Sequence, residues 1–371
     1  MKLFYLVELL SPYRVEWMNL LSEKFEVYVF YFDENERTRE QKWLESVDNN
    51  FKKCHVENKV ICGIRISNDV FKILEQDNYD IYIIDGYASF AQVKVIRWLT
   101  KRNKKVFVNV DGIDIWRRET ILSRLKGVIK SGVYKSGAKF LCGSRIAADR
   151  IISLGANNKN VFTHPFTSLH ESDIIVFEQK EKYQENYKLK INAKDKRVVV
   201  AAGRFIPLKR YDVLIKAWKN MPDDCILFLI GGGELRQEYE EIIRDLSIPN
   251  IKIIDYLDKE KLNEFYLAAD LFVHTSETEV WGLVLNEAMA KGCPVISTDH
   301  CVGGVELIRN GIEGYIVKVG NVDELNRRMK DIVCNEQVKK QMMKNSIERI
   351  SPYTFENLAK IHIGIFKEIT R

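Results

Sequence analysis

Short apolar runs alternate with amphipathic stretches along almost the whole chain, and this rhythm restricts the fold more than any other feature. The runs are nearly continuous in Val, Ile, Leu and Phe, which is typical of strands buried on both faces of a parallel sheet. Most precede a stretch of about 10–18 residues with helical periodicity, as in repeated β–α–β units. The pattern predicts an α/β protein. The expected strands are Lys2–Leu6, Val27–Phe32, Ile81–Ile84, Val106–Val110, Lys139–Cys142, Val161–Thr163, Val198–Ala202, Ile226–Ile230, Ile251–Ile254, Leu271–His274, Pro294–Ser297 and Gly314–Val317.

The length of the chain and one polar segment predict two domains. The chain has 371 residues, and a domain has roughly 100–200. Residues 168–197 interrupt the rhythm, since they are rich in Lys, Glu, Gln and Asn. We therefore expect a junction near residues 166–180, with a first domain of residues 1–170 and a second domain of residues 180–352.

Charge, cysteines and hydropathy exclude several classes of protein. A formal net charge of +5 is too small to indicate a nucleic-acid partner by itself. The seven cysteines include no C-x-x-C pair and the histidines no H-E-x-x-H motif, so we expect no metal site. Cysteines without paired spacing indicate reduced thiols and a cytoplasmic chain. The apolar N-terminus is interrupted by Glu8 and is interpreted as a strand rather than a signal peptide. No apolar run reaches the roughly 18 residues of a membrane span.

A glycine–arginine turn follows the first expected strand of the second domain. It contains Gly203, Arg204 and Lys209 and precedes an expected helix. A glycine at a strand end lets a ligand approach the backbone, and arginine and lysine can hold a diphosphate. The alternative is a solvated turn with two surface cations. The next strand is followed by a second turn, Gly231–Gly233, which is an incomplete phosphate-binding pattern or a plain tight turn.

Two glutamates, Glu279 and Glu287, flank seven residues after a later strand. We expect a helix from about Gly282 to Lys291, with Glu279 in the loop before it and Glu287 inside it. The first amides of such a helix lack intrahelical partners and, with the helix dipole, suit a diphosphate. These amides belong to Gly282, Leu283 and Val284. The alternative is a solvated helix with two ordinary glutamates.

The order and spacing of these features resemble glycosyltransferase family 4, a retaining family with the GT-B fold. The similarity is strongest over residues 198–333 and consists of a G-R-x-x-x-x-K turn, a glycine turn and an E-x7-E pair. It implies two facing Rossmann-like domains with parallel sheets, and a donor site built mainly by the second domain. It also implies that the C-terminal helix, residues 353–371, crosses back to the first domain, which is the acceptor domain.

Position by position, the resemblance implies roles for the second domain. Arg204 and Lys209 would hold the diphosphate and stabilise the leaving nucleotide. Glu279 would meet hydroxyls of the donor sugar, and Glu287 would accept hydrogen bonds from the ribose. The turn Tyr256-Leu257 matches the region that contacts the base. The other donor-binding positions are Gly203, Gly233, Gly282, Leu283 and Val284.

The charge that develops on the diphosphate also bears on cofactors. No D-x-D triplet occurs in the chain, and fixed cations can take over the role of a metal in stabilising the leaving group. We therefore expect no catalytic metal and no cofactor. The nucleotide diphosphate sugar would be a co-substrate.

The first domain is expected to contact the acceptor. Many family members have glycines after the first strand, whereas this chain has residues 7–14 without glycine. Either Tyr13 and Arg14 line the acceptor pocket, or this segment only begins a helix, with Ser11 as N-cap and Pro12 at the first position.

Two aspartates follow predicted strands of the first domain, and ligands of α/β proteins bind at the carboxyl ends of such strands. Asp85 is an acceptor candidate. Asp111 is the candidate for a polar group near the reacting carbon or the acceptor hydroxyl. The alternative is that both belong to Asp-Gly turns. His164 and His274 are interpreted as structural rather than catalytic groups.

A basic segment, residues 117–139, contains seven cations and one acid, with apolar residues near helical spacing between them. One hypothesis is that it binds an anionic membrane surface and holds the protein on the inner face of the membrane. The alternative is a solvated cationic face over an ordinary core stripe.

The leading hypothesis for function is transfer of a sugar from a nucleotide diphosphate sugar to a hydroxyl of a glycan or lipid-linked acceptor, with retention. Surface polysaccharide or lipopolysaccharide assembly is the pathway expected from the breadth of the family. Rival hypotheses are a GT-B-like nucleotide-sugar epimerase, a dehydrogenase and a non-catalytic partner subunit. A sugar isomer formed without acceptor would favour the epimerase, and binding of nicotinamide would favour the dehydrogenase. Donor binding without turnover would favour the partner subunit.

Overall fold

The computed structural model describes residues 1–33, 49–61, 64–113, 116 and 130–370, and the contacts of the chain divide it into two compact units. The first unit consists of Met1–Thr167 and Thr354–Arg371, and the second of Ser168–Tyr353. The boundary between Thr167 and Ser168 lies at the start of the segment that was expected to hold the junction.

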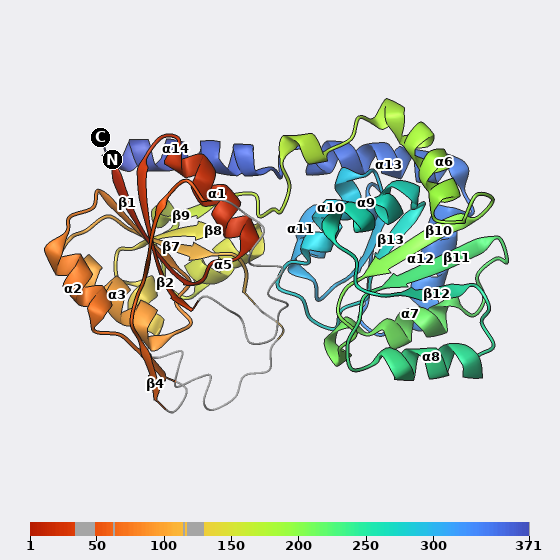
Figure 1. Ribbon diagram of the computed structural model, residues 1–371, viewed down its shortest axis with the longest axis horizontal. Helices are drawn as coiled ribbons and strands as arrows, with labels where there is room; N and C mark the ends of the chain where they lie inside the picture. The colour runs from red at the N-terminus through yellow and green to blue at the C-terminus, as the bar shows by residue number, and fades with distance from the viewer. Residues whose placement is uncertain (34–48, 62–63, 114–115, 117–129, 371) are drawn as a thin grey trace. The chain divides into compact units, whose positions relative to one another are not determined.

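A parallel sheet of seven strands, in the order β3-β2-β1-β6-β7-β8-β9, forms the centre of the first unit (Figure 1). Its central strand β1 pairs with β2 on one side and with β6 on the other, so the strand order reverses between β1 and β6. The strands are β1 (Lys2–Leu9), β2 (Glu26–Asp33), β3 (Lys52–His55), β6 (Ile81–Asp85), β7 (Val106–Val110), β8 (Lys139–Cys142) and β9 (Val161–Thr163). The helices are α1 (Pro12–Ser22), α2 (Asp69–Gln76), α3 (Phe90–Thr100), α5 (Arg145–Ser153) and α14 (Phe355–Thr370), and β4 (Lys59–Ile61) with β5 (Ile64–Ile66) forms an antiparallel hairpin.

The second unit repeats this plan with a parallel sheet of six strands in the order β12-β11-β10-β13-β14-β15. Here the order reverses between β10 and β13. The strands are β10 (Arg197–Ala202), β11 (Cys225–Ile230), β12 (Ile251–Ile254), β13 (Leu271–His274), β14 (Val295–Thr298) and β15 (Gly314–Val317). The helices are α6 (Lys180–Lys190), α7 (Tyr211–Trp218), α8 (Arg236–Asp245), α9 (Lys259–Ala268), α10 (Leu283–Ala290), α11 (Val302–Leu307), α12 (Val322–Val333) and α13 (Glu336–Ile350).

The predicted α/β architecture with parallel sheets is confirmed, because every expected strand is present and all of them pair in parallel. Burial explains this agreement, since all six residues of β11 are buried, as expected for a central strand covered by helices on both faces. The structure adds the hairpin strands β4 and β5 and also the edge strand β3, none of which the sequence analysis predicted. The four residues of β3, Lys-Lys-Cys-His, are all exposed at the edge of the sheet, so they carry no apolar signal.

The last helix, α14, packs on the first unit, although 186 residues of the second unit precede it in the sequence. Its buried residues Phe355, Leu358 and Phe366 join the core formed by β1, β2 and α1. Figure 1 shows α14, in blue, beside α1, in red. The first unit therefore takes its core from both ends of the chain.

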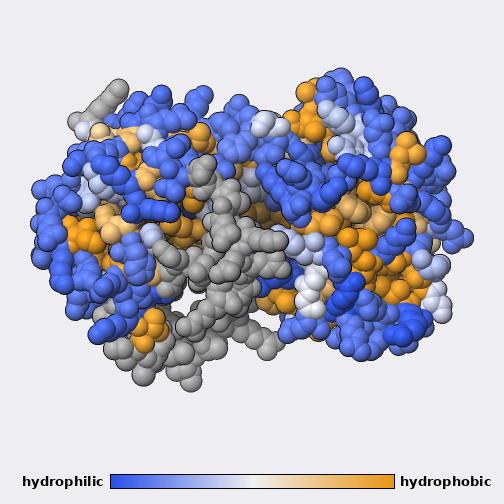
Figure 2. Space-filling model, viewed as in Figure 1, coloured by the Kyte–Doolittle hydropathy of each residue, from blue (hydrophilic) through white to orange (hydrophobic). Residues whose placement is uncertain are grey.

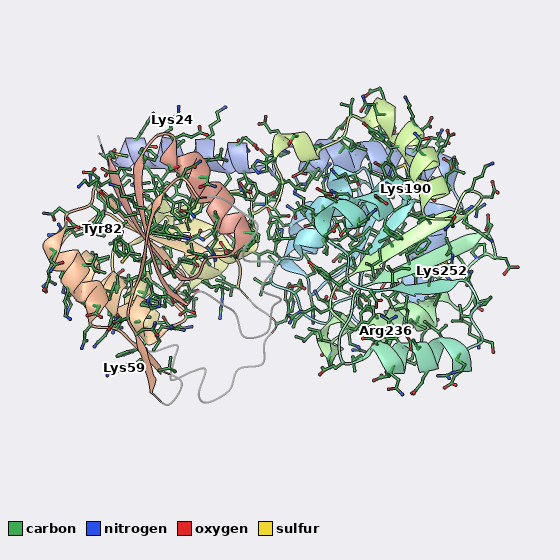
Figure 3. The ribbon with its side chains drawn as sticks, viewed as in Figure 1. Lys24, Lys59, Tyr82, Lys190, Arg236 and Lys252 are labelled. Atoms are coloured by element: carbon green, nitrogen blue, oxygen red, sulfur yellow. The ribbon has the colours of Figure 1, made fainter. Side chains whose placement is uncertain are left out.

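The surface is mostly hydrophilic on the face of each unit that Figure 2 displays, with scattered hydrophobic patches. Lys190 and Lys252, labelled in Figure 3, are exposed charges of the second unit. Within the described part of the chain, we find no helix with the length and hydropathy needed to cross a membrane.

Candidate functional site

The candidate residues of each unit follow strands at the place where the strand order reverses. In the second unit, Gly203 follows β10 and Glu279 lies in the loop after the neighbouring strand β13. In the first unit, Arg14 lies on α1, directly after β1, and Asp85 ends β6. In open parallel sheets this reversal leaves a crevice at the carboxyl ends of the strands, where ligands bind.

Two glycine turns of the second unit hold each other in place. The N–H of Phe205 donates to the carbonyl of Gly232 at 2.7 Å, and the N–H of Leu235 donates to the carbonyl of Phe205 at 3.1 Å. A Cβ atom on Gly233 would lie 2.6 Å from the Phe205 carbonyl oxygen, and its φ is +146°. This close approach of two backbones requires glycine, so the second turn shapes the first.

An ion pair between Lys209 and Glu279 joins the turn after β10 to the loop after β13. The side chains are only 17% and 23% exposed, respectively. Thr275 Oγ1 also donates to the Lys209 carbonyl at 2.8 Å. On the other side of the loop, the Glu279 N–H donates to the His300 carbonyl at 3.0 Å. Neighbouring loops therefore hold both members of the ion pair in place, and both side chains remain partly exposed to solvent.

The surroundings of Glu279 keep its carboxylate ionised. Burial raises the pKa of Glu279, but the His274 imidazole and the Lys209 ammonium lower it more strongly, to about 2. Glu279 is therefore an anion throughout the physiological range, able to orient hydroxyls but not to donate a proton.

The helix that was expected from Gly282 to Lys291 is α10, Leu283–Ala290. Gly282 is its N-cap residue with φ +87°, and a Cβ atom there would lie 3.5 Å from Cγ of Glu279. The start of α10, including Leu283 and Val284, therefore adjoins the Lys209–Glu279 pair. The first amides of a helix have no intrahelical partners and attract anions.

Glu287 lies inside α10 and has a different environment from that of Glu279. Its carboxylate accepts hydrogen bonds from Ser168 Oγ at 3.3 Å and Tyr266 Oη at 3.4 Å. Burial raises the pKa of Glu287 above its ordinary value. Its two hydroxyl partners demonstrate that this carboxylate can receive hydrogen bonds from hydroxyl groups.

Three other predicted donor residues lie apart from this ion pair. Arg204 is exposed and forms no ion pair with any residue that the structure describes. Tyr256, which is 65% exposed, and Leu257 follow β12, two strands away from β10. The structure therefore unites Gly203, Lys209, Glu279 and Gly282, whereas Arg204 and Tyr256-Leu257 follow other positions along the same edge of the sheet.

The four candidates of the first unit form one partly buried cluster of charged and polar side chains. Arg14 pairs with Asp85 through Nη1 and with Asp111 through Nη2, the latter at 2.6 Å. Tyr13 Oη donates to Asp111 Oδ2 at 3.4 Å. Asn109, on β7, donates to Asp85 at 3.1 Å and to Asp111 at 2.7 Å. Residues from three segments of the sequence therefore meet at the reversal point of the first sheet.

This cluster carries two carboxylates for one guanidinium. Burial and the neighbouring Asp111 raise the pKa of Asp85, although Arg14 opposes them. The helix alternative also holds in part, since Pro12 begins α1 and Ser11 occupies its N-cap position. The prediction that Ser11 caps the helix through its side chain is wrong, however. The Ser11 side chain makes no cap hydrogen bond, and its Oγ is buried without a partner in the described structure.

The sequence analysis missed three polar residues of these two sites. Tyr5 Oη accepts a hydrogen bond from Arg14 Nη1 at 3.0 Å. Tyr5 and Asn109 both lie within apolar strands, and a polar group inside a buried run was the available signal. His274 was interpreted as structural, and its imidazole lies 3.7 Å from the Glu279 carboxylate. No sequence pattern indicates that contact, since it depends on the path of the loop after β13.

Two further expectations concern metals and membranes. Among the described residues, no group of three or more His, Cys, Asp or Glu side chains is arranged to hold a metal ion. Most of the basic segment, residues 117–129, lies outside the described residues. Of its cations, Lys130 lies over the Tyr87 ring at 5.3 Å.

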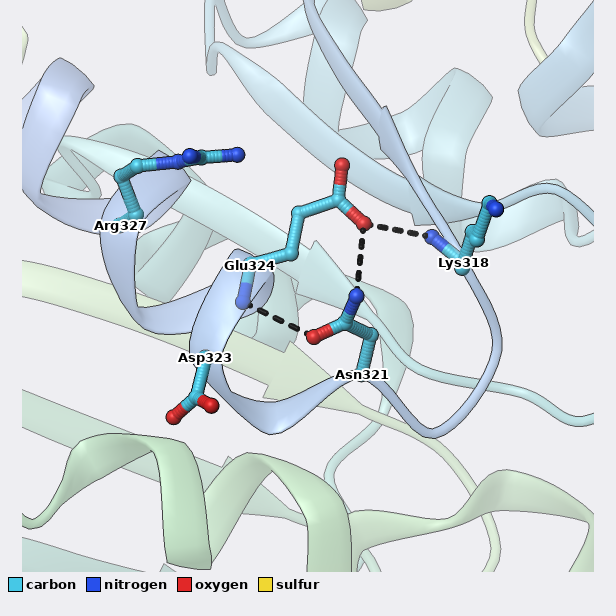
Figure 4. Close-up of a pocket in the computed structure, with 5 residues that line it drawn as sticks. All are labelled: Lys318, Asn321, Asp323, Glu324 and Arg327. Atoms are coloured by element: carbon cyan, nitrogen blue, oxygen red, sulfur yellow. Dashed lines mark hydrogen bonds between the residues drawn. The ribbon is translucent and has the colours of Figure 1, made fainter.

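A separate hollow of the second unit, between the end of β15 and the start of α12, is lined by charged and amide side chains (Figure 4). Its Glu324 accepts hydrogen bonds from Asn321 Nδ2 at 3.3 Å and from the Lys318 N–H at 3.2 Å. Asn321 is also the N-cap residue of α12, because its Oδ1 accepts a hydrogen bond from the Glu324 N–H at 3.1 Å. The polar groups of this hollow therefore have a structural role.

The sequence of the chain is similar to those of known glycosyltransferases. Residues 183–349 match the family described as glycosyl transferases group 1. A glycosyltransferase of Methanocaldococcus jannaschii, itself uncharacterized, is 24% identical over 85% of this chain and 94% of its own length. The lipopolysaccharide core biosynthesis glycosyltransferase LpsE of Rhizobium meliloti is 29% identical over 42% of this chain. That second match covers 45% of LpsE, so the chain spans less than half of that relative.

Solved structures resemble the chain over nearly all of its length. Anabaena HepE in complex with UDP has a TM-score of 0.78 at 16% identity, covering 99% of this chain and 100% of HepE. Sucrose-phosphate synthase from Thermosynechococcus elongatus has a TM-score of 0.76 at 15% identity, covering 100% of this chain and 99% of the synthase. These likenesses confirm the predicted GT-B fold with two Rossmann-like domains.

Proposed function

We propose that the protein transfers a sugar from a nucleotide diphosphate sugar to a hydroxyl, with retention, and the match of residues 183–349 to the glycosyl transferases group 1 family supports this proposal. The single observation that carries this proposal is the Lys209–Glu279 pair beside the start of α10. A cation and free helix amides favour the developing diphosphate charge, and an ionised carboxylate beside them can orient the sugar.

In the proposed complex, Lys209 releases Glu279 and binds the diphosphate, together with Arg204 and the amides of Gly282, Leu283 and Val284. The exposed Arg204 has no ion pair to give up among the described residues. Glu279 then accepts hydrogen bonds from donor-sugar hydroxyls, and Glu287 exchanges its Ser168 and Tyr266 partners for the ribose hydroxyls. Fixed cations that strengthen their contacts as charge develops lower the barrier.

The first unit would supply the acceptor site through Tyr13, Arg14, Asp85 and Asp111. A partly exposed cluster with two carboxylates can accept hydrogen bonds from sugar hydroxyls. We therefore propose a glycan or lipid-linked acceptor and a place in surface polysaccharide or lipopolysaccharide assembly. The role of the relative LpsE in lipopolysaccharide core biosynthesis supports that choice.

Three finer points belong to the same proposal. The leaving group is stabilised by cations without a catalytic metal, and no cofactor takes part. The protein works in the cytoplasm, and the basic segment of residues 117–139 holds it on the anionic inner face of the membrane. Retention at low salt by vesicles rich in anionic lipid, but not by neutral vesicles, is the result expected for this last point.

The first experiment is a screen of UDP-, GDP- and ADP-sugars by thermal unfolding. A ligand that binds only the folded state raises its stability, so one nucleotide should raise the unfolding temperature. UDP is the first to test, because the structures of Anabaena HepE contain UDP, UDP with glucose, or UDP-glucose. Product analysis by NMR with a glycan acceptor should then find the anomeric configuration of the donor retained.

Replacement of Lys209 by alanine should weaken binding of that nucleotide about 10- to 100-fold, the loss expected for a charge-assisted hydrogen bond. Lys252→Ala is the matched control, because Lys252 is an exposed lysine on the edge strand β12 (Figure 3). Equal losses in both variants, or binding by Lys209→Ala at the wild-type affinity, would contradict the proposal. A sugar isomer formed without acceptor would indicate an epimerase.

A further inference from the structure

His274 lies beneath the Lys209–Glu279 pair at the end of β13 and is only 2% exposed. Its Nε2 is 3.0 Å from Ser276 Oγ and 3.7 Å from Glu279 Oε2. Its Nδ1 is 3.4 Å from Ser297 Oγ. Serine hydroxyls can donate or accept, so this environment suits both the neutral and the protonated imidazole.

The groups around the His274 ring are themselves fixed. A Cβ atom on Gly304 would lie 2.4 Å from Ser297 Oγ, so the start of α11 packs directly on that serine. A Cβ atom on Gly282 would lie 3.6 Å from His274 Nε2 and 3.4 Å from Cys301 Sγ. Because Gly282 is the N-cap residue of α10, the imidazole is packed against the same helix start that adjoins Glu279.

Three titratable groups act on this imidazole: Glu279 from the loop after β13, Lys209 from the turn after β10, and Cys301 before α11. Burial by itself lowers the pKa of His274, but Cys301 and Glu279 raise it more, so that it lies above the ordinary histidine value. Lys209 opposes protonation, since its positive charge is close.

Donor binding as proposed above creates a difficulty at this point. Lys209 has one ammonium group and two competing anions, namely Glu279 and the incoming diphosphate. When Lys209 turns to the diphosphate, Glu279 loses its cation although its side chain is only 23% exposed. A partly buried carboxylate without a partner is costly.

We propose that His274 is a positioning residue whose imidazolium replaces Lys209 as the cation of Glu279 when the donor binds. The inference rests on the proposed function, because it requires a diphosphate beside Lys209. Departure of Lys209 removes the charge that opposes protonation of His274 and leaves the anion that favours it. Donor binding and proton uptake by His274 are therefore linked.

The test is calorimetric titration of the full-length protein with UDP at pH 8, in two buffers of different ionisation enthalpy. The terminal phosphate of UDP, like other phosphate monoanions with a pKa of about 6, is ionised at this pH, so it takes up no proton. The wild type should take up a fraction of a proton, and its affinity should fall between pH 7 and pH 9. His274→Gln should take up none, bind UDP about tenfold more weakly at pH 7, and approach the wild type at pH 9.

Two other variants sharpen the result. Glu279→Gln should also abolish proton uptake, because it removes the anion that His274 serves. His55→Gln is the control, since His55 lies in the first unit, where its Nε2 is 3.0 Å from the Phe32 carbonyl oxygen. It should keep the wild-type uptake.

The outcomes separate this inference from the proposed function. A wild type that binds none of UDP, GDP or ADP overturns the proposed function and this inference together. A wild type that binds without proton uptake, or a His274→Gln variant with an unchanged pH dependence, overturns only the role of His274. Circular dichroism checks that His274→Gln is folded, and if it is not, the wild type and Glu279→Gln decide the question.

Discussion

Arg14 illustrates at the residue scale how one side chain can belong to both the fold and the candidate site. It begins its helix as an ordinary first-turn residue, yet its guanidinium bonds to Asp85 from β6 and Asp111 from the loop after β7. The two carboxylates that pair with Arg14 thus come from segments that are about 70 and 100 residues away in the sequence. The residue types predicted a polar site here, but the pairing depends on how the strands are ordered.

Replacement of Arg14 by methionine should therefore destabilise the first unit. It leaves two partly buried carboxylates without their cation, which costs about 3–5 kcal/mol at pH 8. In the variant, burial and the neighbouring Asp111 raise the pKa of Asp85 without opposition from Arg14, so protonation of Asp85 relieves part of the cost as the pH falls. Denaturant titrations at pH 8 and pH 5 measure this. A difference from the wild type that is as large at pH 5 as at pH 8 would show that the carboxylates are not the cause.

At the scale of secondary structure, the sequence predicted the strands well because their burial leaves a strong apolar signal. The edge strand β3 was missed because its residues are all exposed. Helix α14 was expected from its amphipathic pattern, and the family resemblance implied that it crosses back to the first domain, but the individual residues that it contacts there were not predicted. Its His362 is 1% exposed, and the ring lies 4.7 Å from His164 and 4.9 Å from Trp17. Neither ring nitrogen of His362 has a hydrogen-bond partner within the described structure.

This histidine pair predicts acid-sensitive docking of α14. Burial lowers the pKa of both His362 and His164. The charge of His164 lowers the pKa of His362 further. Both are neutral when folded and bind protons more readily when unfolded, so stability is lost as the pH falls below about 6.5. At pH 5.5 the loss from His362, whose pKa burial lowers well below the ordinary histidine value, should approach about 1.4 kcal/mol. His362→Phe should remove part of that loss in denaturant titrations at pH 7.5 and 5.5, and an unchanged pH dependence would refute the account.

At the scale of the whole molecule, the two units differ in how the chain builds them. The core of the second unit uses residues between Val199 and Met342, within one continuous stretch. The core of the first unit needs α14, because Phe355 and Phe366 pack among residues of β1, β2 and α1. The chain must therefore complete the second unit's sequence before the first unit's core is whole.

Truncation tests this difference. Residues 168–353 alone should fold cooperatively, whereas residues 1–353, without α14, should lose the thermal transition of the first unit or have it strongly lowered. Differential scanning calorimetry measures both transitions, and the full-length protein is the reference. An unaltered first-unit transition in residues 1–353 would mean that α14 adds little to that core.

The sequence by itself determined the class of fold, the strands that form the two sheets and the residue types at the candidate site. It could do so because burial of strands and the spacing of glycines, cations and glutamates are local properties of the chain. Only the tertiary structure decided which of these residues meet. Lys209 reaches Glu279, and Arg14 reaches Asp85 and Asp111, because parallel strands bring segments that are far apart in sequence to the same edge of a sheet. The position of His274 beneath Glu279 was decided in the same way, by the path of a loop that no local pattern specifies.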